Sequence, residues 1–247
     1  MVGFPHGEAE EDEVGAGLIA RLLPFIAHHR LAAGDRLPSE RDLATRFRTS
    51  RPAVREGLAV LEALRVVERR PNSGIYLRAV DRQGSIETMV LQAELGVPLT
   101  EAEVREVVEL RRIMEMQAVR LAAERQAGLD LARIGAALAE GARCVATGKN
   151  MADADAAFHL ALVEATGNRV FLRVVNAFYL MSRTRRRAYF ADGTRAASSQ
   201  AQHEAMRDAV AARDADRAEA AMGSHLRGVE SYWLELLHRS SGETGKK

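Results

Sequence analysis

Three histidines and one aspartate in the second half of the chain fall at positions where helical patterning predicts an apolar, inward-facing side chain. Asp155 and His159 are four residues apart, so a helix would place them on one face. His203 and His225 fall on the apolar faces of two later predicted helices. Singly, a histidine on an apolar face is more often a core residue with a hydrogen-bond partner than a metal ligand. Together, one carboxylate and three imidazoles from three helices predict a metal site inside a helical bundle.

The donor types of this predicted site narrow the choice of metal. Imidazole nitrogens with one carboxylate oxygen suit Zn²⁺, Ni²⁺ or another divalent transition metal, with coordination positions left open for water or a ligand. Mg²⁺ and Ca²⁺ instead prefer shells made wholly of oxygen. The alternative interpretation is that the three histidines are structural residues of the core.

Arg111 is another polar residue on an apolar face, within a helix predicted over residues 100–125. A buried arginine destabilises the fold unless a partner neutralises it. One interpretation is an intrahelical ion pair with Glu115. The other is that the guanidinium projects into a cavity and binds a carboxylate ligand bidentately. The arginines of segment 183–187 could add positive potential to the cavity or to the DNA-binding face, but the preferred interpretation is a solvent-exposed helix surface.

Arg51 and Arg55 lie one helical turn apart at the start of another predicted helix, opposite its Leu and Val side chains. Arginine binds phosphate oxygens and guanine edges bidentately. Ser50 and the N-terminus of the same helix offer neutral donors to a phosphate. These positions predict contacts with nucleic acid, although a solvent-exposed helix surface would present the same residues.

The elements around these arginines are predicted in the order helix, helix, helix, hairpin. A first helix covers residues 14–30, Ser39 caps a second with Asp42 three residues later, and Ser50 begins the third. Two β-prone runs then flank a turn at residues 71–73. This is the order of a winged helix-turn-helix, whose third helix enters the major groove of DNA.

The net charge of +1 over 247 residues suggests no nucleic-acid partner, but the charge is unevenly distributed. Residues 30–78 contain eleven arginines and six acids, whereas residues 1–29 contain one arginine and five acids. A basic segment beside a larger neutral one predicts two domains with different partners. The single cysteine excludes a disulfide-stapled scaffold, and no apolar run reaches the roughly 18 residues of a membrane-spanning helix. With no secretory pattern at the N-terminus, a soluble cytoplasmic protein is expected.

From residue 86 onward the periodicity is helical throughout, which predicts an all-α bundle of six or seven helices. The predicted fold class is therefore mainly α, with an N-terminal winged helix-turn-helix followed by a C-terminal helical bundle. The predicted boundaries are a disordered acidic tail at 1–13, the winged helix-turn-helix at 14–78, a linker at 79–87, a helical ligand- and metal-binding domain at 88–239 and a disordered tail at 240–247.

The segment LPSERDLATRFRTSRPAVREGLAVLEALRVVERRPNSGIYL resembles the DNA-binding domain of the GntR family of bacterial transcription regulators. The family's DNA-contacting positions correspond here to Arg41, Ser50, Arg51, Arg55 and Gly74. The resemblance implies that Gly74 is the wing-tip glycine whose backbone approaches the minor groove. Two features depart from the family pattern, namely Pro24 in the first helix and Val66-Val67 where Gly-Leu is usual.

Four later segments resemble the FCD ligand-binding domain found in the FadR-like branch of that family. They are ELRRIMEMQAVRLAAERQ, DADAAFHLALVEATGNRVF, QAQHEAM and DADRAEAAMGSHL. The resemblance implies that the metal ligands are Asp155, His159, His203 and His225. It also implies that Arg111 binds the carboxylate of the effector, and it suggests the seven-helix subtype of the domain.

We therefore expect a ligand-responsive transcription regulator, and not an enzyme. The expected regulator is a repressor that binds double-stranded operator DNA as a homodimer and senses a small carboxylate at the metal site, with no membrane partner. One alternative is a metal-dependent hydrolase or lyase in the bundle, although no further carboxylate or histidine is placed as a general base. Another is a metal-ion sensor, in which the ion itself is the signal.

Overall fold

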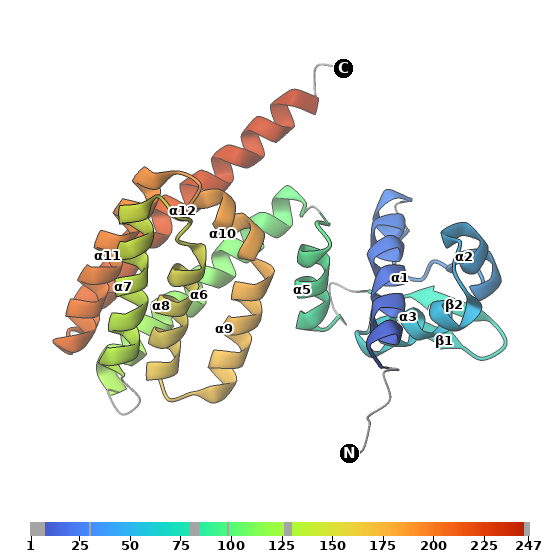
Figure 1. Ribbon diagram of the computed structural model, residues 1–247, viewed down its shortest axis with the longest axis horizontal. Coiled ribbons are helices and arrows are strands. Elements are labelled where there is room, and N and C mark those ends of the chain that lie inside the picture. The colour runs from blue at the N-terminus through green and yellow to red at the C-terminus, as the bar shows by residue number, and fades with distance from the viewer. Residues whose placement is uncertain (1–7, 30, 80–83, 98, 126–129, 245–247) are drawn as a thin grey trace, which may run out of the picture. The chain divides into compact units, whose positions relative to one another are not determined.

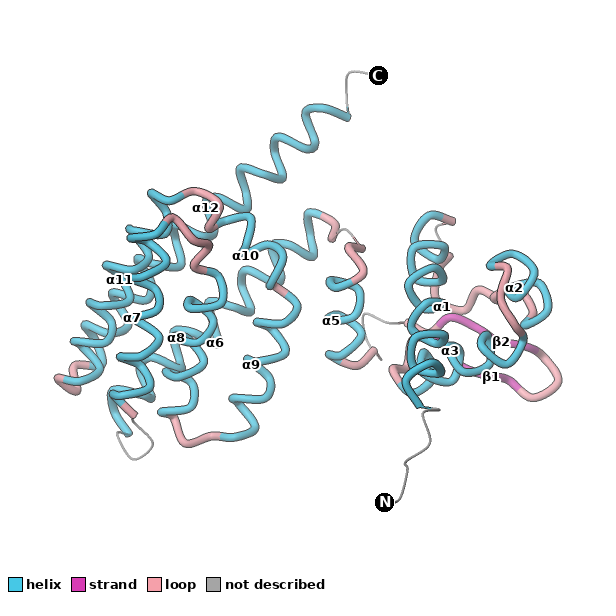
Figure 2. Tube along the Cα trace, in the orientation of Figure 1, coloured by secondary structure: helices cyan, strands magenta, loops and turns pink. Residues whose placement is uncertain are grey.

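The chain divides into two compact units, Met1–Val97 and Pro98–Lys247. The computed structural model describes residues 8–29, 31–79, 84–97, 99–125 and 130–244, and Figures 1 and 2 show its helices and strands. No described helix combines the length and the apolar character needed to cross a membrane.

The first unit is a winged helix-turn-helix, as the sequence predicts. Its elements are α1 (Glu8–His28), α2 (Glu40–Phe47), α3 (Arg51–Ala63), β1 (Val67–Arg70), β2 (Gly74–Leu77) and α5 (Ile86–Glu94). Strands β1 and β2 form an antiparallel hairpin in which Val67 pairs with Leu77 and Arg70 with Gly74. An isolated bridge from Arg36 to Tyr76 widens the base of this wing.

Side-chain caps fix where α2 and α3 begin. The Ser39 hydroxyl accepts a hydrogen bond from the Asp42 N–H and donates one to the Asp42 carboxylate, at 3.2 and 2.6 Å. This confirms the cap predicted from the spacing of the two residues. The Ser50 hydroxyl accepts from the Ala53 N–H at 3.3 Å, and Pro52 in the first turn of α3 lacks an N–H that would need a partner.

The two departures from the family pattern, Pro24 and Val66-Val67, leave the first helix and the wing intact. Helix α1 keeps Pro24 within its bounds. Before the wing, Arg65 takes the left-handed conformation, with φ of 61°. Val66 and Val67 that follow are buried in the core of the unit. The chain therefore bends at Arg65, and both valines contribute apolar packing.

The core of the first unit joins α1, α3 and the wing. Gly57 lets α1 approach α3 closely, because a Cβ there would lie 2.6 Å from Cδ2 of Leu18. Helix α5 also belongs to this unit: Leu91 and Leu95 pack against its core, and the Thr88 hydroxyl donates to the Leu64 carbonyl oxygen at 3.0 Å. The division between the units thus falls later in the chain than the predicted linker.

The ends of the chain and the linker lie only partly within the described residues. Helix α1 begins at Glu8, inside the segment expected to be a tail, and the last helix extends to Thr244. Residues 80–83 of the predicted linker lie outside the described residues.

The second unit is all helical over its described residues and confirms the predicted bundle. Its helices are α6 (Glu101–Arg125), α7 (Leu131–Thr147), α8 (Ala152–Ala165), α9 (Arg169–Met181), α10 (Arg183–Tyr189), α11 (Gly193–Ala211) and α12 (Ala215–Thr244). Asn168 caps α9 by accepting from the N–H groups of Val170 and Phe171. Gly148 ends α7 in the left-handed conformation.

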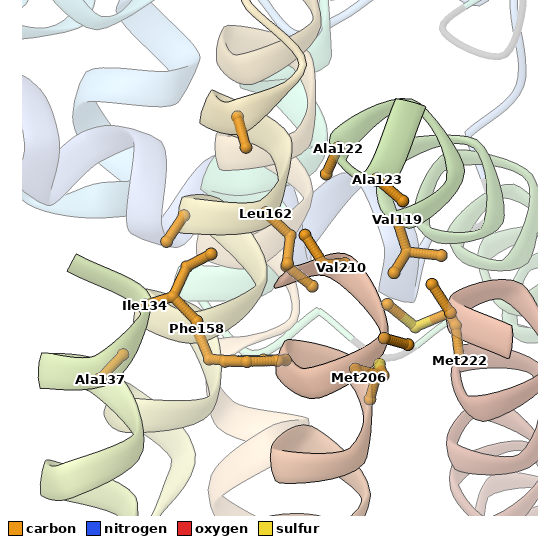
Figure 3. Close-up of a cluster of buried hydrophobic side chains, with 14 of the residues drawn as sticks. Val119, Ala122, Ala123, Ile134, Ala137, Phe158, Leu162, Met206, Val210 and Met222 are labelled. Atoms are coloured by element: carbon orange, nitrogen blue, oxygen red, sulfur yellow. The ribbon is translucent and has the colours of Figure 1, made fainter. Parts of the chain in front are cut away.

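The core of this bundle is built from side chains of α6, α7, α8, α11 and α12, and Figure 3 shows part of this cluster. Val119 of α6, Phe158 of α8 and Met222 of α12 are buried in it. Ile134 of α7 and Met206 of α11 complete the same cluster. Helices α6, α8, α11 and α12 are therefore held side by side, and their inward faces can bring polar residues together.

Candidate metal centre and nucleic-acid interface

The structure brings together the four residues predicted to bind a metal. Asp155 and His159 project from α8, His203 from α11 and His225 from α12. One donor atom from each residue lies within 4.8 Å of the others. All four side chains are buried, with exposed fractions of 0 to 1%. The cluster is thus a closed group of nitrogen and oxygen donors inside the bundle.

The donor atoms of this cluster lack hydrogen-bond partners among the described residues. They are Nε2 of His159, His203 and His225 and both carboxylate oxygens of Asp155. A buried polar atom without a partner costs about 1–3 kcal/mol, so five such atoms at one place would strongly destabilise the fold. A divalent cation bound among them would satisfy these atoms, and the donor set fits a transition metal.

Neighbouring side chains orient two of the rings. Nδ1 of His159 lies 3.0 Å from Oε2 of Glu115, and Nδ1 of His225 lies 3.0 Å from Oε1 of Gln202. An oxygen acceptor at Nδ1 favours the tautomer that carries its proton there, which leaves the Nε2 lone pair free. The Tyr179 hydroxyl donates to the other carboxylate oxygen of Glu115. Glu115 is itself buried, so this tyrosine helps to hold it in place.

The environment keeps two of the imidazoles neutral. Burial, with the nearby charge of His159, lowers the pKa of His203 to about 3. Burial, with the charges of His203 and His159, lowers the pKa of His225 well below its usual value. His203 and His225 therefore have free lone pairs at neutral pH, as metal ligands must.

His159 and Asp155 titrate differently because they lie beside opposite charges. Burial lowers the pKa of His159, but Glu115 and Asp155 on either side outweigh it and raise the value to about 9. Burial raises the pKa of Asp155, but the imidazoles of His159 and His203, each with Nε2 3.5 Å from its Oδ1, outweigh it and lower the value. Without a metal, His159 would therefore carry protons on both nitrogens, Nδ1 facing Glu115 and Nε2 facing Asp155. A bound cation would displace the proton on Nε2.

Arg111 forms the intrahelical ion pair that one interpretation expected, and it also lines a pocket; its binding of a carboxylate stays a prediction. Its Nε lies 3.8 Å from Oε1 of Glu115, one turn along α6, so the intrahelical ion pair exists. Burial lowers the pKa of Arg111, but Tyr179 and Glu115 outweigh it and raise the value, so the guanidinium is charged. The same Nε has no hydrogen-bond partner among the described residues, and Arg111 also lines a pocket beside the metal-site residues.

This pocket is bounded by helices α6, α9, α10 and α12. It is lined by Val104, Val107, Val108, Arg111, Phe178, Ser182, Arg185, Arg186, Leu226, Val229, Glu230 and Trp233. It adjoins the metal cluster, because Nη1 of Arg186 lies 3.7 Å from Oδ2 of Asp155. A largely apolar pocket with a few charged groups is the usual form of a small-molecule site.

The interpretation of segment 183–187 as solvent-exposed is wrong for two of its arginines. Arg183 and Arg187 are exposed and pair with Asp153, at 3.8 and 3.1 Å. Arg186 is buried and donates to the carbonyl oxygen of Tyr179 at 3.0 Å, and Arg185 lines the pocket. The signal in the sequence was the apolar Tyr189 three residues after Arg186, which shares its helix face.

The candidate DNA-contacting residues all lie in the first unit. Arg41 and Arg51 are exposed, on the second and third helices. Arg55 is also exposed, but its Nε lies 2.7 Å from a carboxylate oxygen of Glu40 on α2. The Ser50 hydroxyl caps α3 as described above, which leaves it able to donate its own proton to a phosphate.

Gly74 sits at the tip of the wing with φ of +132°. A side chain is strained at this backbone angle, and a Cβ would lie 2.7 Å from Nε of Arg36. Only glycine therefore lets the wing and Arg36 adopt this arrangement. Arg36, Arg69 and Arg70 line a hollow beside Gly74, which places positive charge around the bare backbone of the wing tip.

Comparisons with known proteins match both units. Residues 16–77 match the model for bacterial regulatory proteins of the GntR family, and residues 106–228 match the FCD domain. The HTH-type transcriptional regulator LutR of Bacillus subtilis is 34% identical over 211 residues, which cover 83% of this chain and 94% of LutR. The galactonate operon transcriptional repressor of Escherichia coli is 29% identical over 83% of this chain and 90% of that protein.

A solved structure supports the fold of the chain. It is described as Lar, which controls the expression of the Listeria monocytogenes agr system, and it matches with a TM-score of 0.61. It is 20% identical and covers 87% of this chain and 94% of that one. The winged helix-turn-helix, the helical bundle and the matched family models agree along most of the chain. The protein belongs to the GntR family of bacterial transcription regulators, and its C-terminal unit is an FCD domain.

Proposed function

We propose that the protein represses transcription by binding operator DNA as a homodimer, and that a small carboxylate bound beside a divalent metal changes its affinity for DNA. The observation that carries this proposal is the convergence of five unpartnered donor atoms next to an arginine-lined pocket. A DNA-binding unit and a ligand-binding unit in one chain are the two parts that such a switch requires. A repressor of bacterial operons acts in the cytoplasm, where the chromosome lies.

In the DNA-bound state, α3 is proposed to enter the major groove. Arg51 and Arg55 would then contact base edges or phosphates, and Ser50 would donate to a phosphate at the N-terminus of the helix. Arg41 would contact the backbone from α2, and the backbone of Gly74 would approach the minor groove. Two copies on a palindromic site would double these contacts.

The homodimer is supported by apolar side chains that stay exposed in the second unit. Ile113 of α6 is 58% exposed and Val170 of α9 is 71% exposed. Leu110, Val174 and Leu180 on the same two helices are also exposed. Exposed apolar groups of this kind are typical of surfaces that a second protein covers.

The proposed metal ligands are Asp155, His159, His203 and His225, and the proposed metal is Zn²⁺ or Ni²⁺. When bound, the metal would supply positive charge and open coordination positions for the oxygen atoms of a carboxylate. Arg111 would bind the same ligand from α6 through its unpartnered Nε–H. Glu115 and Gln202 would keep the rings of His159 and His225 oriented toward the centre.

The experiment is a DNA-binding titration with the region upstream of the protein's own gene. Affinity is measured for chelator-treated protein, for Zn²⁺-loaded protein, and for Zn²⁺-loaded protein with a mixture of small carboxylates. The proposal expects the third condition to differ from the second. A change caused by Zn²⁺ alone would favour a metal-ion sensor. No difference among the three conditions would overturn a ligand response at this site.

A further inference from the structure

Arg185 is a partly buried arginine that has no counter-ion among the described residues. It projects from α10 into the wall of the pocket, and its Nη2 is buried without a hydrogen-bond partner. Burial lowers the pKa of Arg185, and no neighbouring acid acts against that shift. Burying a cation without a partner is costly, so a ligand with an anionic group is the natural complement of this side chain.

The other two arginines of the pocket differ from Arg185 because each already has a partner. Arg111 is paired with Glu115 at 3.8 Å. Arg186 lies 3.7 Å from the carboxylate of Asp155 and donates to two backbone carbonyl oxygens. One Glu, Glu230, also lines the pocket. The pocket thus holds three guanidinium groups against one lining carboxylate, and only Arg185 contributes a charge that nothing described offsets.

Apart from Ser182, whose hydroxyl already donates to the Tyr179 carbonyl oxygen and accepts from Nε of Arg186, the remaining walls of the pocket are apolar. They come from valines at three positions of α6, Phe178 of α9, and Leu226, Val229 and Trp233 of α12. Such walls pack against hydrocarbon and would leave the hydroxyl groups of a sugar acid without partners. The part of the ligand that does not meet the arginines should therefore be hydrocarbon.

We propose that the effector is a dicarboxylate with a hydrocarbon backbone, and that Arg185 binds its second carboxylate. This proposal rests on the proposed function, in which Arg111 and the metal bind the first carboxylate. Arg185 selects diacids over monoacids, because a monoacid would leave its buried Nη2 without a partner.

The test compares straight-chain acids matched in length on the full, Zn²⁺-loaded chain. The pairs are propionate with malonate, butyrate with succinate, pentanoate with glutarate, and hexanoate with adipate. Binding is measured by calorimetry, with zinc retention checked after each titration. At least one diacid is expected to bind about tenfold or more tightly than its monoacid, as expected for a charge-assisted pair in a desolvated site.

The matched variants are Arg185→Gln and Arg183→Gln, which remove neighbouring charges of the same helix. Arg185→Gln is expected to reduce the diacid preference to about threefold or less while monoacid affinity changes little. Arg183→Gln, whose arginine is exposed and paired with Asp153, should keep the full preference. Arg185→Lys, which retains the charge, should restore part of it, and circular dichroism confirms that each variant is folded.

Two results would overturn the dicarboxylate proposal alone. One is equal affinity for the diacid and the monoacid in every pair, and the other is a diacid preference that survives Arg185→Gln. If no acid of either kind binds to the zinc-loaded protein, the proposed function fails as well. The experiment therefore distinguishes an error about the second carboxylate from an error about the carboxylate site itself.

Discussion

Nδ1 of His159 lies 3.0 Å from a carboxylate oxygen of Glu115, in the interior of the helical unit. The contact joins α6 to α8 and turns Nε2 of the imidazole toward Asp155, whose Oδ1 is 3.5 Å away. A single acidic residue on α6 thereby controls the orientation of a donor on another helix. The same residue pairs with Arg111, which lines the adjoining pocket.

Glu115→Gln is predicted to weaken zinc binding by about 10- to 100-fold, the usual effect of losing a carboxylate partner of a ligating histidine. His159 and Tyr179 contact different oxygens of Glu115, so glutamine would turn its NH₂ group toward one of these two donors. Competition with a chromophoric chelator measures the affinity. Glu109→Gln, at an exposed position of the same helix, is the matched control. Equal zinc affinity in the two variants would show that Glu115 does not position the ring.

Removing the metal is predicted to lower the melting temperature of the protein. A metal present at 100 times its dissociation constant adds about 2.7 kcal/mol of stability. For a domain of this size that corresponds to about 5–10 °C. Differential scanning fluorimetry with and without chelator measures the shift. His203→Ala should abolish the response to added zinc, and a response that persists in this variant would contradict the assignment of His203 as a ligand.

Arg51→Ala is predicted to weaken operator binding and to lower the slope of log K against log salt by about one, if its contact is to a phosphate. If its contact is to a guanine edge, the slope stays the same and base preference relaxes, at a cost of about 1–3 kcal/mol. Fluorescence anisotropy over a range of salt concentrations separates the two. Arg173→Ala, at an exposed position in the other unit, serves as the control. Unchanged affinity in Arg51→Ala would exclude a DNA contact.

Gly74→Ala is predicted to destabilise the first unit by about 1–3 kcal/mol, because its backbone angle is strained for any side chain. The added methyl group would also displace Arg36, whose Nε would lie 2.7 Å away. Gly34→Ala is a useful comparison, since Gly34 has φ of +89° but no atom within 4 Å of the new Cβ. Urea unfolding measures both variants. The prediction is wrong if Gly74→Ala costs no more than Gly34→Ala.

Much of the metal site follows from helical periodicity. The spacing of Asp155 and His159, and the apolar neighbours of His203 and His225, identify which faces of three helices point inward. Periodicity does not reveal what lies across the gap from each residue. The sequence therefore does not indicate the roles of Gln202 and Tyr179, because both act through contacts with side chains on other helices. For Glu115, the sequence predicts only an ion pair with Arg111 and not the contact with His159.

The fold was predictable for a similar reason, and its less predictable parts depend on packing between elements. Caps at Ser39 and Ser50 are local, so the sequence indicates where those helices begin. The side on which α5 packs is decided by Leu91 and Leu95 meeting the core of the first unit, which no local pattern reveals. Likewise, α10 is short, so Tyr189 is its one signal for the inward face of Arg186, and the local pattern does not reveal that Arg185 lines the pocket.

The carboxylate of Glu40 would compete with DNA for the guanidinium of Arg55, because the two residues form an ion pair. Without DNA, Arg55, one turn into α3, already has an anionic partner, the carboxylate of Glu40 on α2, 2.7 Å from its Nε. A groove that recruits Arg55 must replace that partner with acceptors at least as good. If Arg55 contacts DNA as proposed, sites with poorly placed acceptors would gain little from this exchange, and Glu40 would thereby raise the discrimination between operator and random sequence.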